Sequence, residues 1–202
     1  MNETTTCITK NDRFMSKKCL LFMALLWSVC FMAKAQEWNV PAYSFEGVQP
    51  GDPEGRYVKY NDDIIKCHDW LQNTPIGTDE LKRVEAKKFM LSWASGCSHV
   101  LITLEVGLMY IDKGDNEMII SYIGGWSKYA LQHLDKDKNE IAIDCAIAGI
   151  EAQIDLYKKN EKLLSSNKEL KKMINDFISM KKKKKLREYV KKILDPWWDL
   201  KE

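Results

Sequence analysis

The chain of 202 residues is 45% hydrophobic and 30% charged, and its formal net charge at pH 7 is +2. Its cysteines match no spacing of a disulfide-rich scaffold, so that class is excluded and a hydrophobic core has to carry the fold. The sequence contains no G-x-G-x-x-G, Walker or G-x-S-x-G motif, which leaves the common nucleotide-binding and serine-hydrolase classes without support.

Residues 15–36 have the layout of a secretory signal peptide. Lys17 and Lys18 precede an apolar run over residues 19–32, and the small residues within 33–35 form an A-x-A cleavage site. This order of regions predicts export, so we expect a periplasmic or secreted mature protein.

Two alternatives to a cleaved signal, an uncleaved membrane anchor and a lipoprotein, are less favoured. The apolar run is shorter than the roughly 20 residues that cross a bilayer, and Cys30 lacks the small preceding residue of a lipoprotein. We therefore predict a signal peptide over residues 1–35, and residues 1–14 are interpreted as a mis-assigned start upstream of Met15.

Residues 36–60 are predicted to form an irregular arm. The segment contains several residues that break helices, namely Pro41, Pro50, Pro53, Gly47, Gly51 and Gly55. Its aromatic residues Trp38, Tyr43, Phe45 and Tyr57 argue against disorder, because disordered linkers are poor in aromatics. We expect the arm to lie along the helices.

A helical domain is predicted over residues 61–202. Asn61 is expected to cap a helix that ends at Asn73, and Thr78 to cap a second helix that ends near Ser95. The inward positions of the second helix are predicted to be Leu81, Val84, Phe89, Met90 and Trp93.

The segment 99–111 is apolar enough for a buried helix and β-branched enough for a strand; periodicity does not separate the two, and we favour a helix. Further helices are predicted over 117–134, 139–160 and 168–194, with Pro196 ending the last one. A shift of the apolar stripe predicts a kink or break within 180–184. The expected fold is all-α, a single domain of five or six helices preceded by the arm.

Cysteine and histidine supply two candidate sites. A metal could bind Cys67-His68 or Cys97-x-His99, but neither has the paired spacing of a zinc site. Cys97 with His99 or His68 could act as a nucleophile, because Cys97 precedes a predicted helix N-terminus. A buried thiol or half of a disulfide is favoured instead, with at most one disulfide among Cys67, Cys97 and Cys145. We predict no metal and no cofactor.

The acidic residues suggest no catalytic pair. Glu105 lies among apolar residues, so we expect it to be partly buried, and pairing with a lysine or arginine is favoured over catalysis. Asp144 and Glu151 fall on the polar stripe of the predicted 139–160 helix, where solvent solvates them.

Charge is divided unevenly along the chain. Residues 36–157 carry 11 Lys and Arg against 20 Asp and Glu, whereas residues 158–202 carry 15 against 7. We call residues 36–157 the acidic body and residues 158–202 the basic tail. The basic tail could dock on the acidic body or meet an anionic partner, and both interpretations stay open. The lysine run 181–185 is interpreted as a solvated helix face rather than a nucleic-acid site, because the chain is predicted to be exported.

A pattern of helix and turn residues runs through Trp70, Thr74, Pro75, Ile76, Arg83, Ala86, Phe89 and Trp93. It resembles a group of small exported helical proteins of unknown function from Gram-negative, Bacteroidota-type bacteria. The resemblance implies a helical fold and an envelope location, and it transfers no catalytic residue.

We therefore expect a non-catalytic envelope protein that binds another protein or an anionic surface through its basic tail. We expect no nucleic-acid partner and no transmembrane helix in the mature chain. The alternative is a small hydrolase that uses Cys97, His99 or Glu105. Convergence of these three residues in one cleft would favour the enzyme, and their scatter would favour the binding protein.

Overall fold

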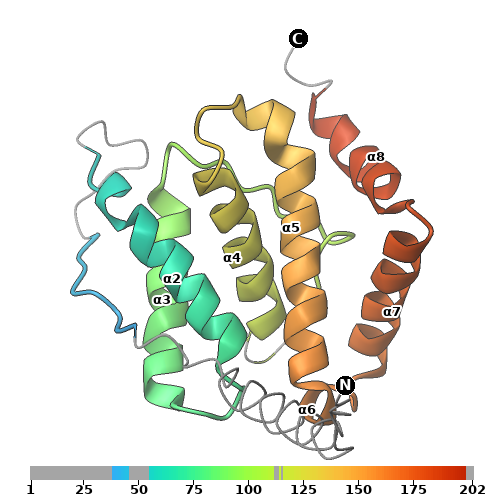
Figure 1. Cartoon of the computed structure of the whole chain (residues 1–202), viewed down its shortest axis with the longest axis horizontal. Coiled ribbons are helices and arrows are strands. Elements are labelled where there is room, and N and C mark those ends of the chain that lie inside the picture. The colour runs from blue at the N-terminus through green and yellow to red at the C-terminus, as the bar shows by residue number, and fades with distance from the viewer. Residues whose placement is uncertain (1–37, 46–54, 112–113, 115, 199–202) are drawn as a thin grey trace, which may run out of the picture. The chain divides into compact units, whose positions relative to one another are not determined.

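Helices dominate the structure, a computed structural model that describes residues 38–45, 55–111, 114 and 116–198 (Figure 1). The elements are the 3-10 helix η1 (Val58–Tyr60) and the α-helices α2 (Asn61–Asn73), α3 (Glu80–Gly96), α4 (Glu117–Leu131), α5 (Lys138–Lys159), α6 (Glu161–Leu164), α7 (Lys168–Lys182) and α8 (Leu186–Trp198). The all-α prediction is confirmed, since these residues contain no strand. The predicted count of five or six is wrong, because the described residues form seven α-helices.

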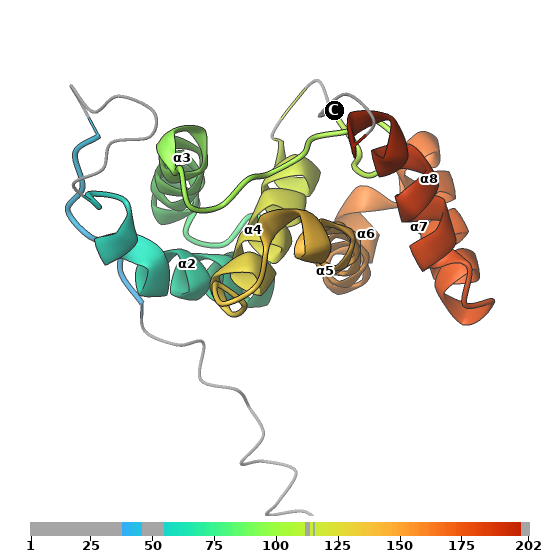
Figure 2. The ribbon, with the colours of Figure 1, turned by 90° about the horizontal axis from the view of Figure 1, so that it is seen from above.

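The central pair of helices is α4 and α5. α2 and α3 contact α4 from one side, and α7 and α8 contact α5 from the other (Figures 1 and 2). A Cβ at Gly125 would lie 2.6 Å from the carbonyl oxygen of Ala148, and a Cβ at Gly149 would lie 2.6 Å from Tyr122 Cδ2. The two glycines therefore allow α4 and α5 to approach closely.

The described part of the N-terminal arm packs against α2 and α3, as expected. The Trp38 ring centroid lies 6.3 Å from that of Trp70 and 6.4 Å from that of Phe89. Phe45 stacks on Tyr57 at 4.9 Å with an angle of 2° between the ring planes. Aromatic burial therefore attaches this irregular segment to the helices.

The starts of α2 and α3 correct the predicted caps. η1 runs directly into α2, so Tyr60 occupies the N-cap position and Asn61 is already helical. Thr78 belongs to a turn that starts at Pro75, and α3 begins only after Asp79. Asp79 has a φ of 49° and forms no side-chain cap. Capping by Asn61 and Thr78 is therefore wrong, and the Asn61 side chain makes a different contact.

The buried face of α3 also differs in part from the expected one. Leu81 is 84% exposed and Val84 is 41% exposed, so neither is a core residue. The buried positions are Arg83, Ala86, Phe89, Met90, Trp93 and Gly96. The face is rotated because Arg83, which was not among the expected inward positions, is buried in a network of polar partners.

The helix favoured over 99–111 is wrong, and the segment is no strand either. The side chains of α4 hold its backbone: Trp126 Nε1 donates to Leu101 O at 2.9 Å, and Tyr122 Oη donates to Thr103 O at 3.2 Å. These side chains satisfy carbonyl groups that a helix or sheet would otherwise pair. The segment therefore crosses the helices as an irregular chain (Figure 2).

The C-terminal segment breaks where the shifted apolar stripe predicts. Lys184 has a φ of 58°, Lys185 N donates to Met180 O at 2.9 Å, and Lys184 N donates to Lys181 O at 3.1 Å. These two bonds form a Schellman motif that ends α7. α8 then continues past Pro196 to Trp198, so the predicted stop at Pro196 is wrong.

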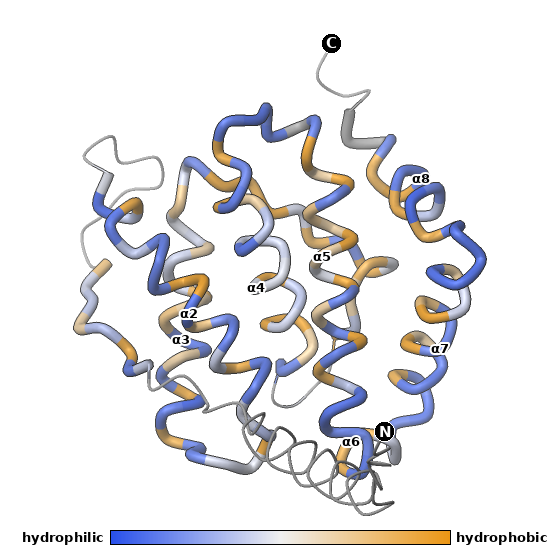
Figure 3. Tube along the Cα trace, in the orientation of Figure 1, coloured by the Kyte–Doolittle hydropathy of each residue, from blue (hydrophilic) through white to orange (hydrophobic). Residues whose placement is uncertain are grey.

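Both apolar stripes of the tail reach the same core. Ile174, Phe177, Leu186, Val190 and Leu194 are each at most 5% exposed. Figure 3 shows the apolar sides of α7 and α8 turned toward α5 and the hydrophilic sides turned outward. The break therefore lets two faces that would diverge on one straight helix pack on α5.

Cys67, Cys97 and Cys145 are all free thiols. No helix in the described ranges has the length and apolar character to cross a bilayer. The described residues all belong to one compact unit, and the predicted signal peptide lies outside them.

Candidate functional site

Cys97, His99 and Asn61 meet beyond the C-terminal end of α3. Cys97 Sγ lies 3.3 Å from Nδ1 and 3.7 Å from Nε2 of His99, and that Nε2 lies 2.9 Å from Asn61 Oδ1. Because an amide oxygen only accepts hydrogen bonds, Nε2 of neutral His99 carries the proton and donates it. Nδ1 therefore carries the lone pair, which is the tautomer of a Cys–His–Asn site.

The electrostatics of this cluster oppose an active thiolate. Burial raises the pKa of Cys97, although the backbone N–H groups of Val100 and His99 and the charge of Lys138 act in the other direction. Burial, together with Lys138, lowers the pKa of His99. The pair is therefore a neutral thiol beside a neutral imidazole, whereas a nucleophilic cysteine needs a lowered thiol pKa.

The geometry is also unfavourable for proton transfer. A sulfur aligned with the lone pair of one ring nitrogen would be distant from the other nitrogen, across the ring. Cys97 Sγ is close to both nitrogens of His99, so it lies away from the lone-pair direction. The neighbouring cavity of about 50 Å³ is lined by His99 but not by Cys97, and it holds at most a few water molecules.

Glu105 does not join this cluster. It is half-buried in the irregular segment and forms no ion pair with the described residues, so the favoured pairing is not observed. Its charge acts on Tyr122, whose pKa is raised by burial first and then by Cys145 and Glu105. The structure therefore brings together Cys97 and His99 and leaves Glu105 apart from their contacts.

The other cysteine–histidine pair is divided between two environments. Cys67 is fully buried and donates to Ala86 O at 3.4 Å, while His68 lines a groove on the next face of α2. Within the described ranges, no group of three or more His, Cys, Asp or Glu side chains is placed to hold a metal ion.

Sequence reasoning missed a buried ionic cluster. Arg83, which is 0% exposed, donates from Nε to Glu117 Oε1 at 3.0 Å and from Nη2 to Oε2 at 2.6 Å. Nη1 donates to Thr74 O at 3.0 Å, and Lys87 Nζ donates to Glu117 Oε1 at 2.7 Å. The cluster ties α2, α3 and α4 together. An arginine in the same helical register as Ala86, Met90 and Trp93 was the available signal.

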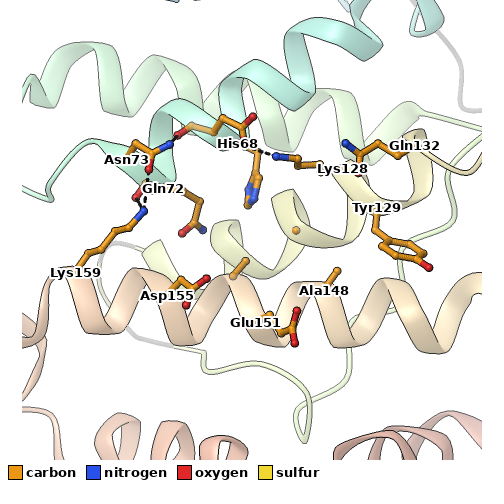
Figure 4. Close-up of a pocket in the computed structure, with 13 residues that line it drawn as sticks. His68, Gln72, Asn73, Lys128, Tyr129, Gln132, Ala148, Glu151, Asp155 and Lys159 are labelled. Carbon is orange, nitrogen blue, oxygen red and sulfur yellow. Dashed lines mark hydrogen bonds and ion pairs between the residues drawn. The ribbon is translucent and has the colours of Figure 1, made fainter. Parts of the chain in front are cut away.

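A groove of about 360 Å³ opens between α2, α4 and α5, and we call it the central groove (Figure 4). Its polar walls carry His68, Asp69 and Gln72 from α2, Lys128 from α4, and Glu151, Asp155 and Lys159 from α5. Small residues, Gly125, Ala148 and Ala152, line it as well. Sequence reasoning missed the groove because its walls are far apart in the chain. The Gly124-Gly125 pair within a predicted helix was the only local signal.

The lysine run 181–185, which we call the basic turn, is exposed between α7 and α8. Lys181 pairs with Glu151 at 2.5 Å, and Arg187 nearby pairs with Asp144. The predicted polar stripe of α5 thus meets the basic tail through two ion pairs. The four lysines of 182–185 form no ion pair with other described residues.

Comparison of the chain with protein-family models, with curated proteins and with solved structures gave no match. The functional argument therefore rests on the geometry and electrostatics of these sites alone.

Proposed function

We propose that this chain is an exported, non-catalytic binding protein of the cell envelope, and that it engages an anionic partner through the basic turn. The observation that carries the proposal is the difference between the two sides of the tail. Its apolar side is buried on α5, whereas the lysines of 182–185 are exposed and free of ion pairs among the described residues. The positive charge of these four lysines is not used in the packing of the tail on α5, so it is available to an anionic partner.

The signal-like layout of residues 15–36 supports export. N-terminal sequencing of the protein from the envelope fraction tests this part, with a mature start at Gln36 as the expected result. A start at Cys30, or an intact leader, would contradict it.

The absence of a shared cleft supports a non-catalytic role. Cys97 and His99 are both neutral, and the cavity beside His99 does not reach the thiol. A hydrolase that uses Cys97 with His99 and Asn61 is the second candidate, favoured by the 3.3 Å and 2.9 Å contacts of that cluster.

Alkylation of Cys97 by iodoacetamide separates the two candidates, because the thiolate is the reactive form. In a variant with Cys67→Ala and Cys145→Ala, a binding protein should show a rate that rises only above the ordinary thiol pKa. A plateau near neutral pH would support the hydrolase.

Sedimentation with phospholipid vesicles tests the basic turn. Each lysine near an anionic bilayer contributes about 1 kcal/mol, so a variant with glutamine at 182–185 should lose about 4 kcal/mol, roughly a thousandfold in partitioning. The matched control places glutamine at four exposed lysines elsewhere, Lys66, Lys88, Lys136 and Lys158. Equal loss in both variants would show a net-charge effect only and would remove the basic turn from the proposal.

A further inference from the structure

The central groove is hollow because small residues line it. A Cβ at Gly125 would lie 2.6 Å from Ala148 O and 2.8 Å from Ala152 Cβ, so the helices here are already in contact at their backbones. A Cβ at Gly124 would overlap Nδ1 of His68. Gly124 thus leaves room for the imidazole to enter the groove, where Figure 4 shows it pointing from α2 toward α5.

His68 contributes a buried ring that has no hydrogen-bond partner among the described residues. The residue is 8% exposed, and neither ring nitrogen has a hydrogen bond to another described residue. Burial lowers its pKa to about 4, with Asp69 opposing and Lys128 and Lys159 reinforcing the effect. At neutral pH the imidazole is therefore uncharged, and one nitrogen presents a lone pair.

Two ion pairs already involve charged residues that line the groove. Lys128 Nζ pairs with Asp69 Oδ1 at 2.6 Å, and Glu151 pairs with Lys181 at 2.5 Å. Lys159 Nζ donates to the carbonyl oxygen of Gln72 at 2.9 Å and to an asparagine side chain at 2.8 Å. Lys128 and Glu151 therefore already have counter-charges, and Lys159 is held by two neutral acceptors.

Three acceptor groups of the groove have no partner among the described residues. Asp155 is exposed and forms no ion pair with other described residues. Gln72 donates from Nε2 to Ser121 Oγ at 2.5 Å, while its Oε1 is buried without a partner in the described residues. The lone pair of His68 is a third free acceptor among the described lining residues, and residues 36–157, which supply most of the lining, contain 20 acidic against 11 basic residues.

We propose that the central groove binds a primary ammonium group, with Asp155 as its counter-ion and the His68 ring as a hydrogen-bond acceptor. A small anion is disfavoured, because it would face the unpaired carboxylate of Asp155, and Lys128 is already paired with Asp69. The ammonium group can come from a free amine or from a lysine side chain of a peptide. The site uses residues other than the basic turn, so it does not depend on the proposed function.

Titration of the purified protein with small amines, followed by the NMR signal of the His68 ring, tests the site. The probes are n-butylammonium, putrescine and Nα-acetyl-lysine amide, with acetate and phosphate as anionic controls. A saturable shift with amines is expected, in the weak range that a ligand of few atoms reaches. Preference for butylammonium or putrescine identifies a free amine, and preference for the acetyl-lysine amide identifies a peptide side chain.

A matched pair of variants ties binding to the groove. Asp155→Asn should weaken amine binding by about 1.4-fold to fivefold, the effect of an exposed ion pair of about 0.2–1 kcal/mol. Glu140→Gln removes an exposed charge from the same helix, about 22 Å away along its axis, and should leave binding unchanged. Equal binding by Asp155→Asn and wild type, saturation by the anions instead of the amines, or no saturation with any amine would overturn the proposal.

Discussion

Replacement of Glu117 by glutamine should destabilise the protein strongly. Glu117 is 7% exposed and receives hydrogen bonds from Arg83 and Lys87. The substitution keeps the side-chain volume but leaves the fully buried guanidinium of Arg83 without its counter-charge. Loss of one partner of a buried ion pair costs about 3–5 kcal/mol, a large part of the roughly 5–15 kcal/mol by which a domain is stable.

Urea unfolding at 25 °C measures this loss, and Glu85→Gln is the matched control. Glu85 lies on the exposed side of α3, so its neutralisation should change the unfolding free energy by less than about 0.5 kcal/mol. A loss below about 1 kcal/mol in Glu117→Gln would refute the view that the cluster is an essential tie between the helices.

The pH dependence of stability gives a second readout of the same cluster. Burial opposes the charged form of Glu117, but the hydrogen bonds and charges of Arg83 and Lys87 lower its pKa below the ordinary value of 4.5. The unfolded state therefore binds this proton more readily, so the stabilisation is present above pH 4.5 and is lost as pH falls through the lower folded pKa. Glu117→Gln should abolish this part of the acid dependence.

Three further measurements test other parts of the fold. Lys184→Gly should raise stability by about 1 kcal/mol, because glycine adopts the left-handed conformation without strain; a loss in urea unfolding would contradict the Schellman assignment. Leu194→Ala should lower the unfolding free energy by about 2–5 kcal/mol, whereas Lys191→Ala, at an exposed position of the same helix, should change it by less than about 0.5 kcal/mol. Equal effects of the two substitutions would show that α8 is not part of the core. His68 should titrate in NMR with a pKa of about 4 rather than 6.5. Its contribution to stability should therefore fall as pH drops from 6.5 toward 4 and then level off. An ordinary pKa would show that the imidazole is exposed to solvent.

Periodicity predicted the helices whose packing follows a simple stripe. The 139–160 segment, with its thin polar edge, becomes α5 with a shift of one residue at each end. The break within 180–184 followed from two stripes of different phase, and the structure places it at Lys184. These features depend on spacing within one segment, which the sequence contains in full.

Features that depend on distant partners were not predictable. Arg83 is buried because Glu117, 34 residues later, neutralises it. The carbonyl groups of Leu101 and Thr103 need no partner in a helix or a sheet, because side chains of α4 donate hydrogen bonds to them. The close spacing of Cys97 and His99 was visible in the sequence, but the contact of His99 with Asn61 was not.

Salt extraction of the washed envelope fraction tests the central claim most directly. The protein is expected in that fraction and should be released as salt approaches about 0.5 M, because screening removes the attraction between exposed lysines and anionic groups. The variant with glutamine at 182–185 should be released at much lower salt, whereas the control at Lys66, Lys88, Lys136 and Lys158 should follow the wild type. Recovery in the cytosolic fraction, or identical release of all three proteins, would contradict an exported protein that binds through its basic turn.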